Sequence, residues 1–218
     1  MLKYHFLIII IHCCFIVPAQ MQVRDEPRHH NVFENEFLRI LDVYLPPKDT
    51  TLYHLHNTPS VFIVLANTNV SSQLMGKQPQ KGANVSGVVS YDSLATPRLH
   101  RVWNEDTSWF HVMDIELTTK AQHGKVPVLK APSLKLLFTE QQANGYSIDL
   151  KTGNTLELPP SANGYLVVSQ TGSVVDYKIN EIAQHRILKP AHYIWVEAGR
   201  SFSLKASNTA DFVLLQLK

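Results

Sequence analysis

Short apolar runs alternate with polar turn clusters along most of the chain, and the runs are rich in Val, Ile, Leu, Phe and Tyr. Clusters such as PPKD, ANTN, KTGN and SANG separate them. Runs of this kind are typical of β-strands, and many of them at spacings of about ten residues indicate a β-sandwich or barrel. The pattern predicts strands over 37–44, 60–66, 87–91, 109–117, 165–169, 191–196 and 212–218.

Helix is expected in only two short segments. Residues 134–144 contain FTEQQA, which lacks the alternation of a strand, and residues 179–185 are a second weak candidate. The expected fold class is therefore all-β with little helix.

The two halves of the chain share a coarse pattern. Residues of about 35–118 and 135–218 each begin with an apolar segment, continue through a Pro-Pro turn and end in a long apolar strand. The join, QHGKVPVLKAPS, is polar and contains prolines. These features predict an N-terminal arm over 20–34, a first barrel over 35–121, a linker over 122–133 and a second barrel over 134–218.

The first 19 residues have the pattern of a secretory signal peptide. Lys3 precedes an apolar stretch over 6–16, and small residues before Gln20 suggest cleavage after Ala19. The apolar stretch is about half of the ~20 residues that span a bilayer. We expect a secreted or periplasmic protein without a stable membrane span after cleavage; an uncleaved anchor is the alternative.

The positions of the two cysteines and the small net charge exclude several kinds of functional site and partner. Cys13 and Cys14 lie inside the expected signal, so the mature chain would lack thiol catalysis, thiolate metal ligands and disulfides. Lys and Arg number 20 against 18 for Asp and Glu, a formal charge of +2. That weak field argues against a nucleic-acid partner bound through its phosphates.

The candidate chemistry lies in histidines. His54 and His56 are two residues apart just before a predicted strand. Residues at this spacing in an extended segment point to the same face, so both imidazoles can reach one centre. Such a pair supplies half of a metal site on a β scaffold, although the spacing alone also arises by chance.

Two longer stretches carry a family resemblance. Residues 48–66 (KDTTLYHLHNTPSVFIVLA) and 97–117 (PRLHRVWNEDTSWFHVMDIEL) resemble the first and second motifs of the cupin superfamily, in the right order. His100 and Asn104 fit the spacing of the second motif. The resemblance implies a jelly-roll barrel in which His54, His56 and His100 hold at most one divalent metal per chain: Fe, Mn, Ni, Cu or Zn.

The first motif departs from the family pattern. Ser60 stands where the family has a metal-binding Glu, and Lys48, Asn67 and Pro97 replace glycines. A three-His site without a carboxylate ligand is expected. Ser60 is a candidate substrate-side residue, as is Asn104; capping of a turn is the alternative role for Ser60.

His111 is the candidate acid or base. In 109–117 the odd-numbered positions are the more apolar, so they are expected to face the barrel interior, and His111 would share that face. A buried, hydrogen-bonded histidine with no catalytic role is the alternative. His29 and His30, in the expected arm, and His123, in the linker, are assigned no role.

The second half resembles a cupin unit without its ligands. Residues 154–172 match the first motif in hydrophobic pattern, but Pro and Ser replace its histidines, and Phe202 stands at the histidine position of the second motif. The chain thus resembles a bicupin with a degenerate C-terminal unit.

Several functions remain open at this point. The leading hypothesis is a secreted metal-binding cupin with dioxygenase-like activity on a small organic molecule. The alternatives are a non-catalytic cupin that binds a small molecule or sugar, and a metal-dependent isomerase or hydrolase that uses His111. The resemblance is also compatible with a homodimer, and the sequence does not decide whether the protein is an enzyme.

Overall fold

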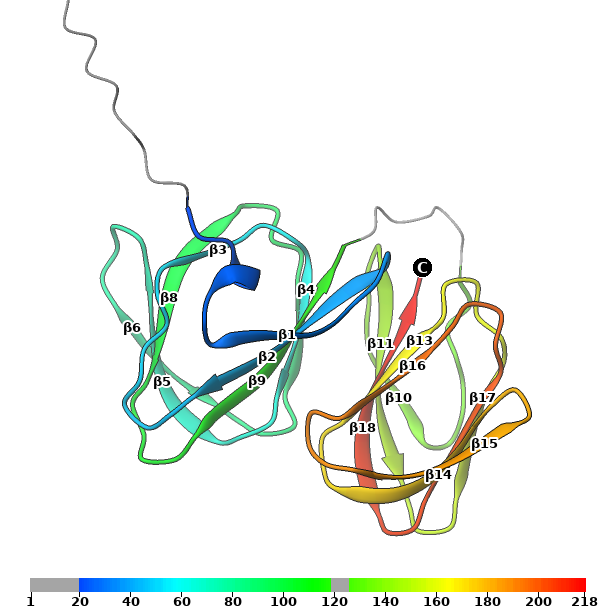
Figure 1. Cartoon of the computed structure of the whole chain (residues 1–218). Coiled ribbons are helices and arrows are strands. Elements are labelled where there is room, and N and C mark those ends of the chain that lie inside the picture. Colours follow the sequence, from blue (N-terminus) through cyan, green and yellow to red (C-terminus); the bar gives the residue numbers. More distant parts are fainter. Residues whose placement is uncertain (1–19, 119–125) are drawn as a thin grey trace, which may run out of the picture.

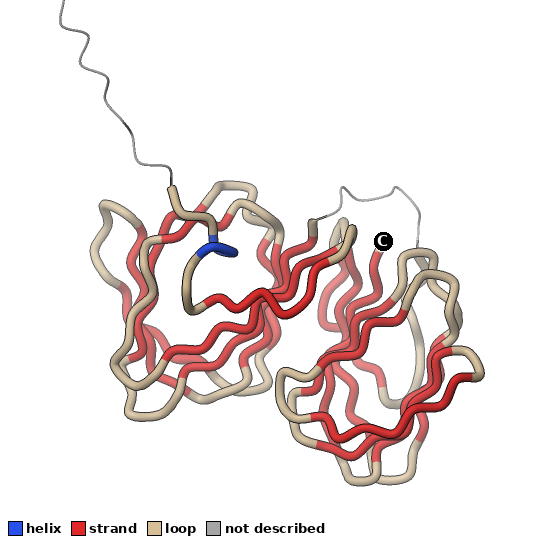
Figure 2. The backbone as a smooth tube through the Cα atoms, viewed as in Figure 1, coloured by secondary structure: helices blue, strands red, loops and turns tan. Residues whose placement is uncertain are grey.

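The computed structural model describes residues 20–118 and 126–218. The expected signal peptide, with Cys13 and Cys14, and His123 of the expected linker lie outside these residues. The described chain forms two β-barrels side by side (Figure 1), and strands make up nearly all of its regular structure (Figure 2). Within the described parts, no helix is both long and apolar enough to cross a bilayer.

The first barrel consists of two antiparallel sheets. One has the order β1-β2-β9-β4-β7 and the other the order β3-β8-β5-β6. A short 3-10 helix, η1 (Val23–Asp25), precedes them. The strands are β1 (His29–Glu34), β2 (Leu38–Leu45), β3 (His54–His56), β4 (Ser60–Val64), β5 (Thr68–Leu74), β6 (Gln80–Asn84), β7 (Val89–Asp92), β8 (Arg98–Asn104) and β9 (Phe110–Leu117).

The second barrel has the same strand order as the first. Its sheets are β10-β11-β18-β13-β16 and β12-β17-β14-β15, which repeat the first barrel with each strand number raised by nine. The strands are β10 (Leu134–Thr139), β11 (Ala143–Leu150), β12 (Thr155–Leu158), β13 (Tyr165–Ser169), β14 (Ser173–Ile179), β15 (Ile182–Leu188), β16 (Tyr193–Val196), β17 (Phe202–Ala206) and β18 (Ala210–Leu217). The expected all-β fold of two jelly-roll barrels is confirmed.

The two five-stranded sheets pack against each other through one apolar core. Met113 and Ile115 from the first barrel lie in the same buried cluster as Val213 and Leu215 from the second. The edges of the sheets also meet, because the ring of Phe33 on β1 lies 5.5 Å from that of Tyr193 on β16. Each of these sheets is therefore covered on both faces.

The two expected helices are wrong. Residues 134–144 form the edge strand β10, a turn and the start of β11. Most of β10 is exposed, including Leu136 and Leu137, so its sequence lacks the alternation of a half-buried strand. Residues 179–185 form a turn at Asn180, whose φ is 51°, between β14 and β15.

The N-terminal segment joins the first barrel. Residues 20–34, expected as an N-terminal arm, contain η1 and the edge strand β1. Val23 is buried with the apolar residues of the first barrel. Gln22 forms an isolated parallel β-bridge with Leu55 of β3. The segment therefore brings polar residues close to the expected histidine site.

The interiors of the two barrels differ in kind. The second is filled by a large cluster of buried apolar side chains, among them Tyr146, Leu156 and Phe202. The first instead contains a cavity of about 650 Å³, which opens beside the histidines. The fold thus provides one filled barrel and one that can hold a ligand.

Candidate metal centre

The three histidines expected from the motifs lie together inside the first barrel. His54 and His56 both point inward from β3, and the antiparallel pairing of β3 with β8 places His54 opposite His100. Their ring centroids are 4.7 Å apart, those of His56 and His100 are 4.9 Å apart, and those of His54 and His56 are 5.0 Å apart. All three rings line the cavity.

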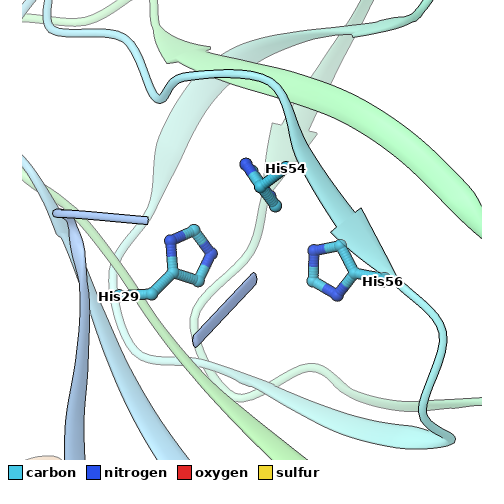
Figure 3. A group of neighbouring side chains, drawn as sticks. All are labelled: His29, His54 and His56. Atoms are coloured by element: carbon cyan, nitrogen blue, oxygen red, sulfur yellow. The ribbon is translucent and has the colours of Figure 1, made fainter. Parts of the chain in front are cut away.

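A fourth histidine, which the sequence reasoning missed, joins this group. His29 is buried at the start of β1, and its ring centroid lies 4.6 Å from that of His54. One ring nitrogen from each of His29, His54 and His56 lies within 4.8 Å of the other two (Figure 3). No motif spacing marks His29; the only local signal is Glu26, three residues earlier. The adjacent His30 is exposed.

Two histidines of this group of three have an acceptor within hydrogen-bonding distance of Nδ1, and the third faces a carboxylate at a longer distance. The Nδ1 of His29 lies 2.8 Å from Glu26 Oε2, and that of His54 lies 2.8 Å from the Leu52 carbonyl oxygen. The Nδ1 of His56 faces Asp114 Oδ2 at 3.5 Å. A proton held at Nδ1 leaves Nε2 free to bind a metal.

Buried ring nitrogens in the cluster have no protein partner. The Nε2 atoms of His54 and His100 make no hydrogen bond to any residue that the structure describes. A buried polar atom without a partner is destabilising unless something else binds it. Imidazole nitrogens are good ligands for Fe, Ni, Cu and Zn, so the residues present fit a divalent transition metal.

Burial keeps these imidazoles neutral. It lowers the pKa of His54 to about 4 and that of His100 to about 3, and it holds the pKa of His56 well below its usual range. At neutral pH the nitrogen lone pairs are therefore available to a metal without release of a proton from an imidazolium.

Glu26 anchors the segment that carries His29. Its side chain is fully buried, and it accepts backbone N–H groups from Arg28 at 2.7 Å and from Leu52 at 3.1 Å as well as the His29 ring. Burial opposes ionisation of Glu26, but these hydrogen bonds hold its pKa below the usual value. The carboxylate thus joins the N-terminal segment to the loop before β3.

The walls of the cavity are mainly apolar, with a few polar groups. Phe62, Val102 and Phe110 are among the apolar lining residues. Arg98 donates to Asp92 Oδ2 at 2.8 Å, while its buried Nε has no partner among the described residues. Such a cavity suits a small organic molecule with an apolar body.

Asp114 is the buried acid of this cavity. Burial, reinforced by the nearby Glu116, raises the pKa of Asp114 to about 7. It comes from β9, the central strand of the covered sheet. The sequence reasoning did not consider it, because it lies outside the motif positions.

The two expected substrate-side residues do not line the cavity. Ser60 is buried and its hydroxyl donates to the Thr58 carbonyl oxygen at 3.1 Å, as expected of a turn-capping residue. Asn104 donates to the carbonyl oxygens of Ser108 at 2.7 Å and Pro46 at 3.1 Å. Asn104 therefore holds the loops at the end of β8.

The expectation that His111 faces the barrel interior is wrong. The even-numbered residues Phe110, Val112 and Asp114 line the cavity, whereas the odd-numbered face of β9 packs on the second barrel. On that outer face, His111 Nε2 lies 2.7 Å from Asp42 Oδ1, and its ring stacks beside Tyr44. His111 therefore does not line the cavity that contains the histidine cluster.

Comparison with known proteins shows likeness in structure alone. No protein-family profile and no curated protein sequence matches the chain. Among solved structures, salicylate 1,2-dioxygenase from Pseudaminobacter salicylatoxidans is similar with a TM-score of 0.59 and 11% identity, over 83% of this chain and 71% of that one. AerE from Microcystis aeruginosa is similar with a TM-score of 0.59 and 10% identity, over 88% of this chain and 98% of that one.

YhaK from Escherichia coli is similar to the same extent, with a TM-score of 0.58 and 12% identity over 86% of this chain and 90% of that one. At this level of identity the likeness defines the architecture and not the activity. Together with the strand order of the two barrels, it shows that the chain shares the fold of these proteins, two jelly-roll barrels.

Proposed function

We propose that the protein binds one divalent transition metal at His29, His54, His56 and His100, and that a small organic molecule occupies the adjoining cavity. One observation carries the proposal: the imidazoles of His54, His56 and His100, which burial keeps neutral, lie together beside His29, and three of their ring nitrogens lack a hydrogen-bonding partner among the described residues. The histidines are those that the motif spacing indicated, supplemented by His29.

The metal would be held by imidazole ligands, with acids nearby to balance its charge. Ser60 leaves no carboxylate at the family's Glu position, but Glu26 bonds His29 and Asp114 faces His56. When bound, such an ion acts as a Lewis acid, and a redox-active one adds one-electron chemistry. The apolar walls exclude bulk water and orient the apolar part of a ligand.

Dioxygenase-like activity is the reaction class we propose. Several of the similar structures are those of a salicylate 1,2-dioxygenase, two of them with gentisate, which supports a small organic substrate for this chain as well. The isomerase alternative loses its proposed acid or base, because His111 lies outside the cavity. Non-catalytic binding is less favoured, because the cluster is not satisfied by hydrogen bonds between its own histidines.

Metal content tests this function. Protein loaded in turn with Fe, Mn, Ni, Cu and Zn and then dialysed is expected to retain about one ion per chain of at least one of them. The double variant His54→Ala/His56→Ala is expected to retain none while keeping the far-UV spectrum of a β-protein. Elemental analysis of both proteins gives the answer.

A matched control is His185→Ala, which removes an exposed histidine that pairs with Asp176 on the second barrel. It should load as the unaltered chain does. A folded, unaltered chain that retains no ion after every loading would contradict the proposal. If the unaltered chain does retain a redox-active ion, measurement of oxygen uptake with small organic acids is the next screen.

We also propose that the chain is exported and cleaved after Ala19. Expression in a host with a general secretion pathway is expected to give a product that begins at Gln20, the start of the described segment that leads to η1. Intact-mass measurement of the exported protein checks the cleavage site. Recovery of an uncleaved chain from the membrane fraction would instead support the anchor alternative.

A further inference from the structure

Asp114 is a buried carboxyl group without a well-formed hydrogen bond, and the nearby Ser60 hydroxyl opposes part of the rise in its pKa. Its side chain is 1% exposed, and neither oxygen has a hydrogen-bonding partner among the residues that the structure describes. It lines the cavity, and its Oδ2 lies 3.5 Å from His56 Nδ1, with the Ser60 hydroxyl also nearby. Nothing in the fold so far explains why a charged group stands there.

The second barrel shows that the fold does not need this carboxylate. Strands β9 and β18 occupy the same place in their sheets, and each pairs along its whole length with the equivalent strand, β2 or β11. Asp114 is the fifth residue of β9, and the fifth residue of β18 is Leu214. Leu214 is fully buried in the apolar core of its barrel.

A second pair of equivalent positions behaves differently. Glu116 accepts a short hydrogen bond from Arg39 in the first barrel, and the equivalent Gln216 accepts one from Asn144 in the second. Glu116 and Gln216 thus each have a hydrogen-bonding partner within their own barrel. Asp114 is a buried acid without such a partner, in the barrel that holds the histidines.

Such a group opposes folding. Removing a carboxylate from water without pairing it is strongly destabilising, and an apolar residue of similar size avoids that penalty. The protein nonetheless has an acid where the equivalent position of the other barrel has leucine. The acid therefore serves the site rather than the fold.

We propose that Asp114 is a positioning residue of the metal centre, which accepts a hydrogen bond from the protonated Nδ1 of His56 so that His56 presents Nε2 to the metal. Glu26 does the same for His29, and the Leu52 carbonyl does so for His54. Asp114 also supplies negative charge on the cavity side, where Ser60 replaces the acid of the family motif. The inference rests on the proposed metal site.

The test compares Asp114→Leu, which copies the second barrel, with Asp114→Asn, which keeps an acceptor for His56 but removes the charge. With Co²⁺ as the probe, Asp114→Leu is expected to weaken binding about 10- to 100-fold and Asp114→Asn to weaken it less. The visible absorption of bound Co²⁺ is expected to change in Asp114→Leu. The melting temperature of metal-free Asp114→Leu is expected to stay equal or to rise.

The matched control is the double variant Arg39→Asn/Glu116→Gln, which gives the neighbouring buried pair the residues of the second barrel. Its Co²⁺ affinity is expected to match that of the unaltered chain. Equal affinity and equal spectra for Asp114→Leu and the unaltered chain would overturn the role of Asp114 and leave the metal site standing. Absence of Co²⁺ binding to the unaltered chain would overturn both.

An Asp114→Leu chain that fails to fold would itself contradict the inference, because the acid would then be needed for the fold. The affinity of Asp114→Asn still reports on the charge in that case. A loss of affinity in Asp114→Asn with an unchanged melting temperature would separate the effect on the site from any effect on folding.

Discussion

Acidification of the metal-free protein from pH 7 to pH 5 is expected to lower its free energy of unfolding by about 4 kcal/mol. The cause is the buried histidine cluster. Burial lowers the pKa of His54 to about 4 and of His100 to about 3, and it holds that of His56 well below its usual range. In the unfolded chain each returns to about 6.5.

The sign follows from which state binds protons. Between the folded and unfolded pKa values, the unfolded chain takes up protons at these three histidines and the folded protein does not, so falling pH favours unfolding. Each histidine contributes about 2 kcal/mol to the loss over this range. Asp114 acts in the opposite direction, because its pKa is raised to about 7 in the folded protein and the folded state therefore takes up its proton over this range. This uptake offsets the loss in the free energy of unfolding by about 2 kcal/mol.

Urea unfolding at pH 7, 6 and 5, with a chelator present, measures this dependence. The matched variant is His100→Phe, which introduces the residue found at the equivalent position of the second barrel, Phe202. The acid-induced loss should shrink by about 2 kcal/mol in this variant. A stability that is flat between pH 7 and pH 5 would show that the cluster is not buried as described.

Replacement of Glu26 by alanine is expected to destabilise the protein by about 3 kcal/mol and to weaken metal binding about 10- to 100-fold. The variant strips the acceptor from the backbone N–H groups of Arg28 and Leu52 and from the His29 ring. The two backbone donors would remain at least partly buried without their acceptor, and His29 would lose the hydrogen bond that orients its ring.

Urea titration at pH 7 and competition with a chelator measure the two effects. Glu36→Ala is the control, because Glu36 is exposed in the turn between β1 and β2, and this variant should match the unaltered chain in both experiments. If Glu26→Ala lost stability but bound metal with full affinity, His29 would not be a ligand. If neither quantity changed, the N-terminal segment would not be anchored as the structure has it.

The strand pattern predicted the fold but not which face of β9 lines the cavity. Neighbouring residues of a strand point to opposite faces, so alternation of apolar and polar residues identifies the buried face when the other face is exposed to solvent. Here both faces are buried, one against the cavity and one against the second barrel. Met113 and Ile115 are apolar because they form the contact between the barrels. Their apolar character suggested that this face lines the barrel interior, so His111, on the same face, was wrongly expected to point into the cavity.

Motif spacing located His54, His56 and His100 but could not locate His29. The three motif residues lie on β3 and β8, whose pairing is local to one sheet. His29 reaches the same point from the opposite sheet, through a segment whose course depends on burial of Glu26 and Val23. The proximity of His29 to the other three histidines is a property of the tertiary structure. It cannot be predicted from a single sequence in which no motif marks His29.

The contact between the barrels restricts how two whole chains can associate. Edge strand β1 meets β16, and edge strand β7 meets β10 through Tyr91 and Phe138. Because β10 and β16 are the counterparts of β1 and β7, this contact has the self-complementary form of a two-fold interface. A single barrel would pair with its copy through that face, but here the face is occupied within one chain. Any homodimer of this protein must therefore be built on a different surface.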